Sequence, residues 1–312
     1  MEQGRVIKTT GKWHTVLDSN NKAVTCSIKG KLRIRGIRTT NPVAAGDKVE
    51  FYRLEEENTG VITDILERKN YIIRKASKLS KEAHIIASNV DQAFLIVTLV
   101  KPQTYLRFID RFLCTTEAYR IPVTIVFNKI DLLEGDLQAR LEKLIEMYEH
   151  AGYKCMKTSA VNHTGVDRLK DFMKDKINVV AGNSGVGKSA LINAIDPELN
   201  LKTKEISKHH KKGKHTTTFP QMHPVSSGGY IIDTPGIKGF GLIDVDKEEI
   251  FHFFPEIFRK SGECKFYNCL HIQEPDCAVK EAVENGEIGQ SRYENYLSIF
   301  FEENEKYRPK GY

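Results

Sequence analysis

The sequence predicts a multidomain α/β protein: a small β-barrel, then a parallel-sheet domain, then a helical segment. Three observations lead to this prediction. Short alternating strands separated by turn residues fill the start of the chain. Continuous apolar runs then alternate with helical patterns, which is typical of a sheet covered by helices on both faces. The remainder is helical with three clustered cysteines. We expect domains at residues 1–70, 71–245 and 246–312.

Composition bounds the class of protein before any motif is considered. The chain has 312 residues, and 47 Lys and Arg against 41 Asp and Glu give a net charge of +6. This modest excess is compatible with an anionic partner and does not establish one. No apolar run approaches the ~20 residues that cross a bilayer, and six cysteines are too few for a disulfide scaffold. We expect a cytoplasmic monomer without a membrane segment.

The first domain is expected to contain six short strands. They are Arg5–Thr9, Trp13–Leu17, Ala23–Ile28, Leu32–Ile34, Lys48–Arg53 and Gly60–Leu66. Their length and spacing favour a small barrel or sandwich. Four basic residues in the stretch 28–36 alternate with apolar ones and therefore share a face: Lys29, Lys31, Arg33 and Arg35. This face is either a solvated outer surface or a basic stripe that follows a phosphate backbone.

The second domain shows buried strands and amphipathic helices. The apolar runs are Phe94–Val100, Val123–Phe127, Ile177–Ala181 and Tyr230–Ile232. One helix face between them is formed by Leu137, Leu141, Leu144, Ile145 and Tyr148. This alternation predicts a mostly parallel sheet.

Residues 182–189 match the phosphate-loop pattern G-x-x-x-x-G-K-[ST] at every fixed position. They are Gly182, Asn183, Ser184, Gly185, Val186, Gly187, Lys188 and Ser189. A strand precedes them and a helical pattern follows, as the motif requires, which disfavours a chance glycine-rich turn. The glycines let backbone N–H groups surround phosphate oxygens. Lys188 would reach the β- and γ-phosphates and Ser189 would ligate Mg²⁺.

Two further motifs indicate guanine as the base. Asn128, Lys129 and Asp131 form an NKxD tetrapeptide after a buried strand. The Asp131 carboxylate can accept hydrogen bonds from N1–H and the exocyclic amine of guanine, a donor pair that adenine lacks. Ser159 and Ala160 follow another short strand and suit backbone contact with guanine O6. Either motif alone is weak, but together with a phosphate loop they predict GTP or GDP as ligand.

The order of the motifs predicts a circularly permuted domain. Asp233 and Gly236, in a DTPG segment, are placed for the Mg²⁺ shell and for a backbone N–H to the γ-phosphate. In ordinary G domains the phosphate loop comes first, but here NKxD and Ser-Ala precede it. The usual termini must be joined near residues 165–177. Because DTPG then leads into the C-terminal domain, we hypothesise that the nucleotide state repositions residues 246–312.

Four residues near the end have the composition of a structural zinc site. Cys264, Cys269, His271 and Cys277 give C-x4-C-x-H-x5-C. Three thiolates and an imidazole suit a closed tetrahedral Zn²⁺ site, and the alternative is scattered cysteines beside a surface histidine. The intervening basic and aromatic residues, 265–267, either contact RNA or pack against the helices.

Taken together, these motifs resemble the RsgA family of circularly permuted GTPases that act in biogenesis of the small ribosomal subunit, over nearly the whole chain. The resemblance implies an OB-fold barrel, a permuted P-loop GTPase domain and a helical zinc-binding domain. It implies 30S-stimulated GTP hydrolysis in late 30S maturation, with 16S rRNA as partner. It also assigns the first switch to Thr216, Thr217 and Thr218. Asn183 and Ala190 depart from the commoner residues at positions outside the fixed motif.

Hydrolysis requires an oriented water, and Ile237 occupies the position after DTPG where many G domains carry glutamine. His215 is the candidate to orient it, and the resemblance points to the same residue. The alternative is one more basic residue on a charged loop. For the whole chain, a nucleotide-gated RNA-binding module with incidental hydrolysis remains the competing function.

Overall fold

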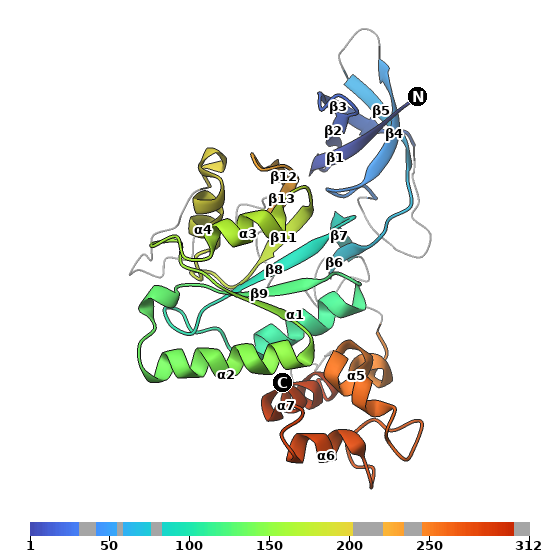
Figure 1. Cartoon of the computed structure of the whole chain (residues 1–312). Helices are drawn as coiled ribbons and strands as arrows, with labels where there is room; N and C mark the ends of the chain where they lie inside the picture. Colours follow the sequence, from blue (N-terminus) through green and yellow to red (C-terminus); the bar gives the residue numbers. More distant parts are fainter. Residues whose placement is uncertain (31–41, 55–58, 76–82, 202–220, 234–244, 303–312) are drawn as a thin grey trace, which may run out of the picture.

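The computed structural model describes residues 1–30, 42–54, 59–75, 83–201, 221–233 and 245–302. A barrel at the N-terminus stands beside an α/β layer, and the C-terminal helices pack under that layer (Figure 1). In the described ranges, every helix is too short or too polar to span a membrane.

Five of the six strands predicted for the barrel are confirmed. They are β1 (Glu2–Thr10), β2 (Trp13–Asp18), β3 (Ala23–Ile28), β4 (Lys48–Leu54) and β5 (Thr59–Ile65). The strand order is β1-β2-β3-β5-β4, and pairing of β1 with β4 closes the barrel. Its interior is filled by buried side chains, among them Val6, Val16, Val24, Phe51 and Ile62. The sixth predicted strand, Leu32–Ile34, lies outside the described residues.

A mixed sheet forms the centre of the α/β layer. Five strands run parallel in the order β10-β9-β8-β11-β13, and β12 adds antiparallel to β13. Their bounds are β8 (Gln92–Val97), β9 (Val123–Phe127), β10 (Lys154–Lys157), β11 (Ile177–Ala181), β12 (Gln221–Pro224) and β13 (Tyr230–Asp233). The strand expected over Phe94–Val100 ends three residues early, because the chain turns after Val97.

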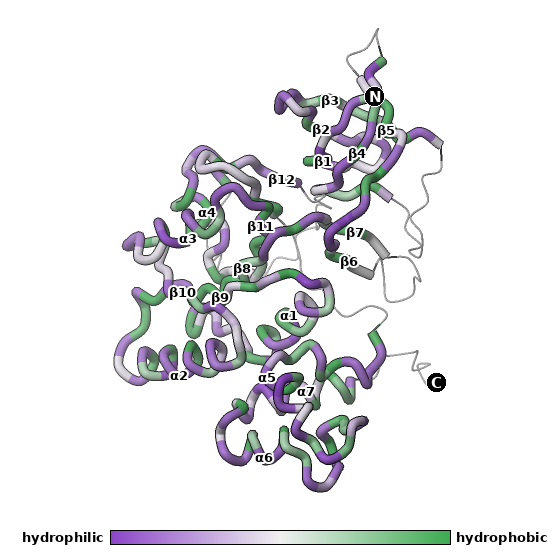
Figure 2. The backbone as a smooth tube through the Cα atoms, turned by 45° about the vertical axis from the view of Figure 1, so that its right-hand side comes forward, coloured by the Kyte–Doolittle hydropathy of each residue, from purple (hydrophilic) through white to green (hydrophobic). Residues whose placement is uncertain are grey.

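Helices cover both faces of this sheet, as the apolar runs predicted. They are α1 (Leu106–Ala118) and α2 (Asp136–Ala151) on one face, and α3 (Val166–Met173) and α4 (Lys188–Ile195) on the other. Successive residues of β8 face opposite cores: Leu95 packs with α1 and α2, whereas Phe94 and Ile96 pack with α3 and α4. Strands β8, β9 and β11 consist mainly of apolar residues, and hydrophobic and hydrophilic residues alternate along the helices (Figure 2). Short 3₁₀ turns lie at Ile130–Leu132 and Pro197–Leu199.

A hairpin that the sequence patterns did not reveal joins the barrel to this layer. It consists of β6 (Tyr71–Lys75) and β7 (Ala83–Ser88). The buried carboxylate of Asp47 accepts hydrogen bonds from the Arg68 guanidinium (2.6 Å) and the Ser88 hydroxyl (2.5 Å). Gly46 approaches the hairpin so closely that a Cβ there would lie 2.0 Å from the Ser88 carbonyl oxygen. The barrel is therefore attached through a specific joint.

The C-terminal part is helical around its own core. It contains a 3₁₀ segment, Lys247–Phe253, followed by α5 (Pro255–Ser261), α6 (Ala278–Glu284) and α7 (Gln290–Phe300). Arg292 on α7 is 1% exposed, and its guanidinium donates to Glu256 on α5 (2.6 and 3.0 Å) and to Asp110 on α1 (2.8 Å). A buried ionic network thus fastens this part to the α/β layer.

Candidate functional site

The carboxyl ends of four parallel strands bring the predicted nucleotide residues to one edge of the sheet. The segments that follow β8, β9, β10 and β11 are residues 98–104, 128–131, 158–160 and 182–187. Ligands of open α/β sheets bind at this edge. Segments distant in the sequence therefore lie together at one edge of the sheet.

The phosphate loop connects β11 to α4 and depends on glycine for its path. A Cβ at Gly182 (φ +144°) would lie 2.3 Å from the Ile96 carbonyl oxygen, so only glycine fits there. The Lys188 ammonium donates to the carbonyls of Gly182 (2.9 Å) and Asn183 (2.8 Å). Ser189 follows in the first turn of α4 and is half-buried. Backbone N–H groups at such a helix start favour phosphate.

The first two NKxD residues hold the phosphate loop from the side. The Asn128 amide donates to the Val186 carbonyl (2.9 Å), and the Thr158 hydroxyl donates to Asn128 Oδ1 (3.1 Å). The Lys129 ammonium donates to the Gly185 carbonyl at 2.7 Å. Burial lowers the pKa of Lys129, and the carboxylate of Asp131 opposes that shift. These side chains therefore couple the base-recognition motif to the phosphate loop.

The Asp131 carboxylate has the exposure that base recognition requires. Its Oδ1 accepts a hydrogen bond from the hydroxyl of Ser159, which is fully buried. The Asp131 side chain itself remains exposed beside Ala160, which is half-buried. Ser159 thus orients the carboxylate, a role in addition to the backbone contact that the sequence suggested.

Several predicted residues lie outside the described parts of the chain. They are His215, Thr216, Thr217, Thr218 and Gly236. Asp233 ends β13, and its backbone pairs with Val180 of β11 two residues before the phosphate loop. Its place in the sheet therefore agrees with the expectation that it follows a strand beside that loop.

The three cysteines and the histidine of the predicted zinc site converge in the C-terminal part. Their ligand atoms all lie within 4.8 Å of one another. His271 Nδ1 lies 3.6 Å from Cys264 Sγ and 3.5 Å from Cys277 Sγ, and the two sulfurs are 3.9 Å apart. For a tetrahedral Zn²⁺ with ordinary bond lengths, the N–S and S–S edges are about 3.6 and 3.8 Å. The geometry therefore fits zinc with His271 Nδ1 as ligand.

The turn that carries the ligands is held by residues outside the motif. The Glu274 carboxylate accepts backbone N–H bonds from Leu270 (2.9 Å), Ile272 (2.8 Å) and Gln273 (3.1 Å). Burial opposes ionisation of Glu274, but these bonds lower its pKa overall. From α7, Tyr293 donates to the His271 carbonyl (2.7 Å) and Tyr296 donates to the Leu270 carbonyl (2.6 Å). The site is thus built into the core of the C-terminal helices.

Comparison with known proteins agrees with this geometry. Two family models match the chain, RsgA GTPase over residues 65–243 and RsgA N-terminal domain over residues 3–62. The chain belongs to the RsgA GTPase family. Two relatives carry the name small ribosomal subunit biogenesis GTPase RsgA. The protein of Christiangramia forsetii is 53% identical over 99% of both chains. That of Bacteroides fragilis YCH46 is 53% identical over 98% of this chain and 99% of its own.

Two solved structures are similar to this chain over almost its whole length. YjeQ from Thermotoga maritima is 37% identical with a TM-score of 0.80, covering 96% of this chain and 98% of its own. YloQ, described as a circularly permuted GTPase, is 32% identical with a TM-score of 0.76, covering 99% and 97%. As an RsgA GTPase, the chain is a circularly permuted GTPase, a hydrolase acting on GTP. The resemblance inferred from the motifs is confirmed.

Several residues of these sites were not predicted from the sequence, among them Thr158 and Glu274. Tyr293 and Tyr296 were not predicted either, and their hydroxyls donate to the carbonyls of His271 and Leu270. The tyrosine type, where phenylalanine would suffice for packing, was the available signal.

Proposed function

We propose that this chain binds the 30S ribosomal subunit and hydrolyses GTP during late assembly of that subunit, with activity stimulated by the subunit. The observation that carries the proposal is the match to relatives named for small-subunit biogenesis along almost the entire chain. The arrangement of four loops at one sheet edge supports a nucleotide site there, which this activity needs. We retain the domain boundaries 1–70, 71–245 and 246–312, a monomeric state and a cytoplasmic location as parts of the proposal.

In the proposed site, residues 182–189 bind the phosphates through backbone N–H groups, and Lys188 turns from its loop carbonyls to the β- and γ-phosphates. The carboxylate of Asp131 recognises guanine. Ser189 and Asp233 would hold Mg²⁺, which neutralises phosphate charge when bound. Thr216 to Thr218 and Gly236 would contact the γ-phosphate side, and His215 would orient the attacking water.

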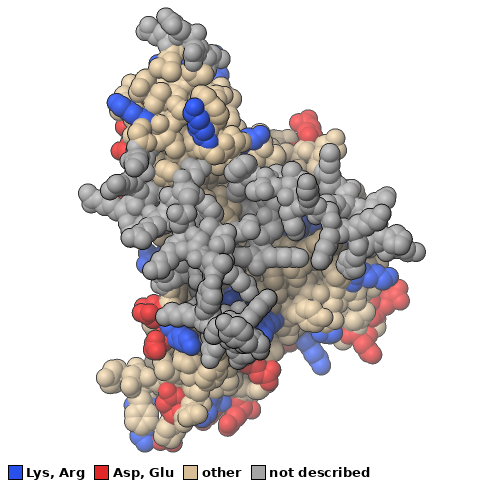
Figure 3. All heavy atoms as spheres, turned by 180° about the vertical axis from the view of Figure 1, so that it is seen from behind, with Lys and Arg blue, Asp and Glu red and all other residues tan. Residues whose placement is uncertain are grey.

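For 16S rRNA, two surfaces supply exposed basic and aromatic groups. On the barrel, Trp13 is 43% exposed with the Lys12 ammonium 5.5 Å from its ring centre, and Lys29 is exposed. Figure 3 shows Lys and Arg side chains on one face of the barrel. On the zinc turn, Tyr267 is fully exposed and Lys265 lies over the Phe266 ring. Such groups suit stacking on unpaired bases. Lys31, Arg33 and Arg35 lie outside the described residues.

The test is GTP turnover by the purified protein alone, with 30S subunits and with 50S subunits, and with ATP in place of GTP. Stimulation by 30S alone supports the proposal. Tight GTP binding without stimulation would instead favour the alternative function, a nucleotide-gated RNA-binding module. A His215→Ala variant should bind GTP normally and lose stimulated turnover, whereas His210→Ala in the same basic run should retain it. Full stimulated turnover by His215→Ala would remove His215 from the mechanism.

A further inference from the structure

The segment between β8 and α1, residues 98–104, touches the phosphate loop although no nucleotide motif includes it. The Lys129 ammonium donates to the Lys101 carbonyl at 2.5 Å and to the Gly185 carbonyl at 2.7 Å. Lys129 thus bridges this segment and the phosphate loop. The two also meet directly, because Pro102 Cδ lies 3.3 Å from the point where a Cβ on Gly185 would stand.

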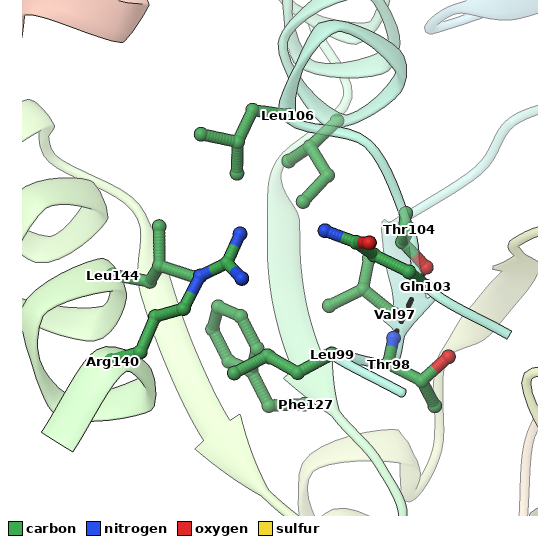
Figure 4. Close-up of a pocket in the computed structure, with 10 residues that line it drawn as sticks. Val97, Thr98, Leu99, Gln103, Thr104, Leu106, Phe127, Arg140 and Leu144 are labelled. Carbon is green, nitrogen blue, oxygen red and sulfur yellow. Dashed lines mark hydrogen bonds between the residues drawn. The ribbon is translucent and has the colours of Figure 1, made fainter. Parts of the chain in front are cut away.

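Two buried threonines fix the shape of this segment. The Thr98 hydroxyl donates to the Pro102 carbonyl (2.5 Å), and Thr104 Oγ1 accepts from the Thr98 N–H (3.1 Å). The Thr104 N–H donates in turn to the Thr98 carbonyl at 2.8 Å. Thr98 is 1% and Thr104 7% exposed, and Figure 4 shows the bond between them. A small cavity of about 10 Å³ lies between this turn and α2 and is lined by Gln103, Arg140 and Leu144 among others.

Lys101 and Lys129, the two residues joined by this hydrogen bond, have backbone conformations that need such support. Lys101 and Lys129 have φ of +49° and +62°, in the left-handed region that non-glycine residues rarely adopt. Residues persist there where the surrounding structure holds them, and such residues cluster at functional sites. Here the hydrogen bonds of the threonine turn hold one of these residues, and the resulting carbonyl position holds the side chain of the other.

We propose that Thr98 and Thr104 are positioning residues for nucleotide binding. They fix residues 98–104 so that the Lys101 carbonyl holds the Lys129 ammonium and Pro102 supports Gly185. Both side chains are buried, so they act through Lys101 and Pro102 and not by direct contact, and the inference rests on the proposed nucleotide site. The supported groups belong to the base motif and the phosphate loop, which GDP and GTP use alike. Loss of this support therefore weakens the binding of GDP and of GTP by the same factor. The turnover rate at saturating GTP stays unchanged.

The experiment compares Thr98→Val with Thr98→Ser, because valine removes the hydroxyl at nearly constant volume and serine retains it. Thr116→Val is the matched control: Thr116 is also buried, and its hydroxyl donates within α1 to Phe112 (3.0 Å) and Leu113 (2.8 Å). Dissociation constants for GDP and for a non-hydrolysable GTP analogue are measured alongside thermal midpoints. We expect about three- to tenfold weaker binding of both nucleotides by Thr98→Val, the worth of one hydrogen bond.

Thr98→Ser should bind like the wild type, and Thr116→Val should lose thermal stability without losing affinity. Thr104→Val provides a second measurement, since it removes the acceptor of the Thr98 N–H, and it should weaken both nucleotides similarly. Affinities of Thr98→Val and Thr104→Val within twofold of the wild type would overturn the positioning role. Equal weakening by Thr116→Val would also overturn it, because general destabilisation would then explain the effect. Failure of the wild type to bind either nucleotide would instead refute the proposed function.

Discussion

Replacing Arg292 with methionine tests the buried network that joins the C-terminal helices to the α/β layer. Methionine fills much of the same volume but removes the guanidinium. Three hydrogen bonds to carboxylates disappear, two to Glu256 and one to Asp110. Asp110 keeps two donors, the Tyr148 hydroxyl (3.0 Å) and the Asn295 amide (2.5 Å). Among the described residues, Glu256 has no other side-chain partner, so its charge is left buried and unpaired.

The expected loss of unfolding free energy follows from these lost contacts. Removing one partner of a buried ion pair costs about 3–5 kcal/mol of unfolding free energy. Burial raises the pKa of Asp110, and Arg292 lowers it in part, so the variant raises it further. A carboxyl group whose folded pKa lies above its unfolded value of ~3.9 binds a proton preferentially in the folded state. The folded variant therefore keeps this proton to higher pH than the folded wild type, and its deficit in unfolding free energy relative to the wild type grows as pH rises through the folded pKa of Asp110.

The assay must report on this part of the chain. The single tryptophan, Trp13, lies in the barrel, so its fluorescence would miss the change. Hydrogen exchange by mass spectrometry should instead show lost protection in α5 and α7 while β8 and β11 stay protected. A variant that also carries Asp110→Asn and Glu256→Gln should recover much of the loss, because no buried charge remains. A loss under about 1 kcal/mol at pH 8 would contradict the argument.

Three further predictions concern the base, the metal and the barrel joint. Asp131→Asn should weaken GTP binding about 10²-fold or more, which is the contribution of two charge-assisted hydrogen bonds. The variant should bind xanthosine triphosphate in preference to GTP, which competition binding would measure. The chain should bind one zinc by atomic absorption, lost in Cys269→Ser and kept in Cys26→Ser. Because burial raises the pKa of the Cys269 thiol to about 12, zinc binding should release protons, measurable by calorimetry in two buffers. Gly46→Ala should destabilise the chain by about 2 kcal/mol or more in chemical denaturation. Gly11→Ala should lower the free energy of unfolding by less. The φ of Gly11 is also positive (+69°), but a Cβ added there would meet no atom within 4 Å.

The predictable features were those whose chemistry is local in sequence. Val123–Phe127 and Ile177–Ala181 are strands with the predicted bounds, because strands buried on both faces are continuously apolar. The phosphate loop was recognisable because its backbone conformation requires glycine at fixed positions. The zinc ligands were recognisable because four soft donors lie within 14 residues of one another, Cys264 to Cys277.

What escaped prediction depends on contacts between distant segments. Nothing in the neighbourhood of Arg292 distinguishes it from an exposed helical arginine, since its partner Asp110 lies 182 positions away. Thr98 was predicted within the strand Phe94–Val100 and Thr104 in no element, and the sequence assigns neither residue a role until Lys101 and Lys129 are placed together. The hairpin β6–β7 was missed because its strands carry few of the turn signals that marked the barrel. In each case the local sequence pattern contains no information about the distant residues that form the contact.

The buried network also limits how the nucleotide state can act on the C-terminal helices. The motif order suggested that DTPG, leading directly into residues 246–312, could reposition them. Detaching these helices from α1 would expose or unpair Arg292, at a cost comparable to the 3–5 kcal/mol argued above. Allosteric couplings are typically about 1–3 kcal/mol, which is too little to break the network. A nucleotide-dependent movement of the C-terminal helices is therefore expected to carry α1 with it, so that α5, α7 and α1 move together.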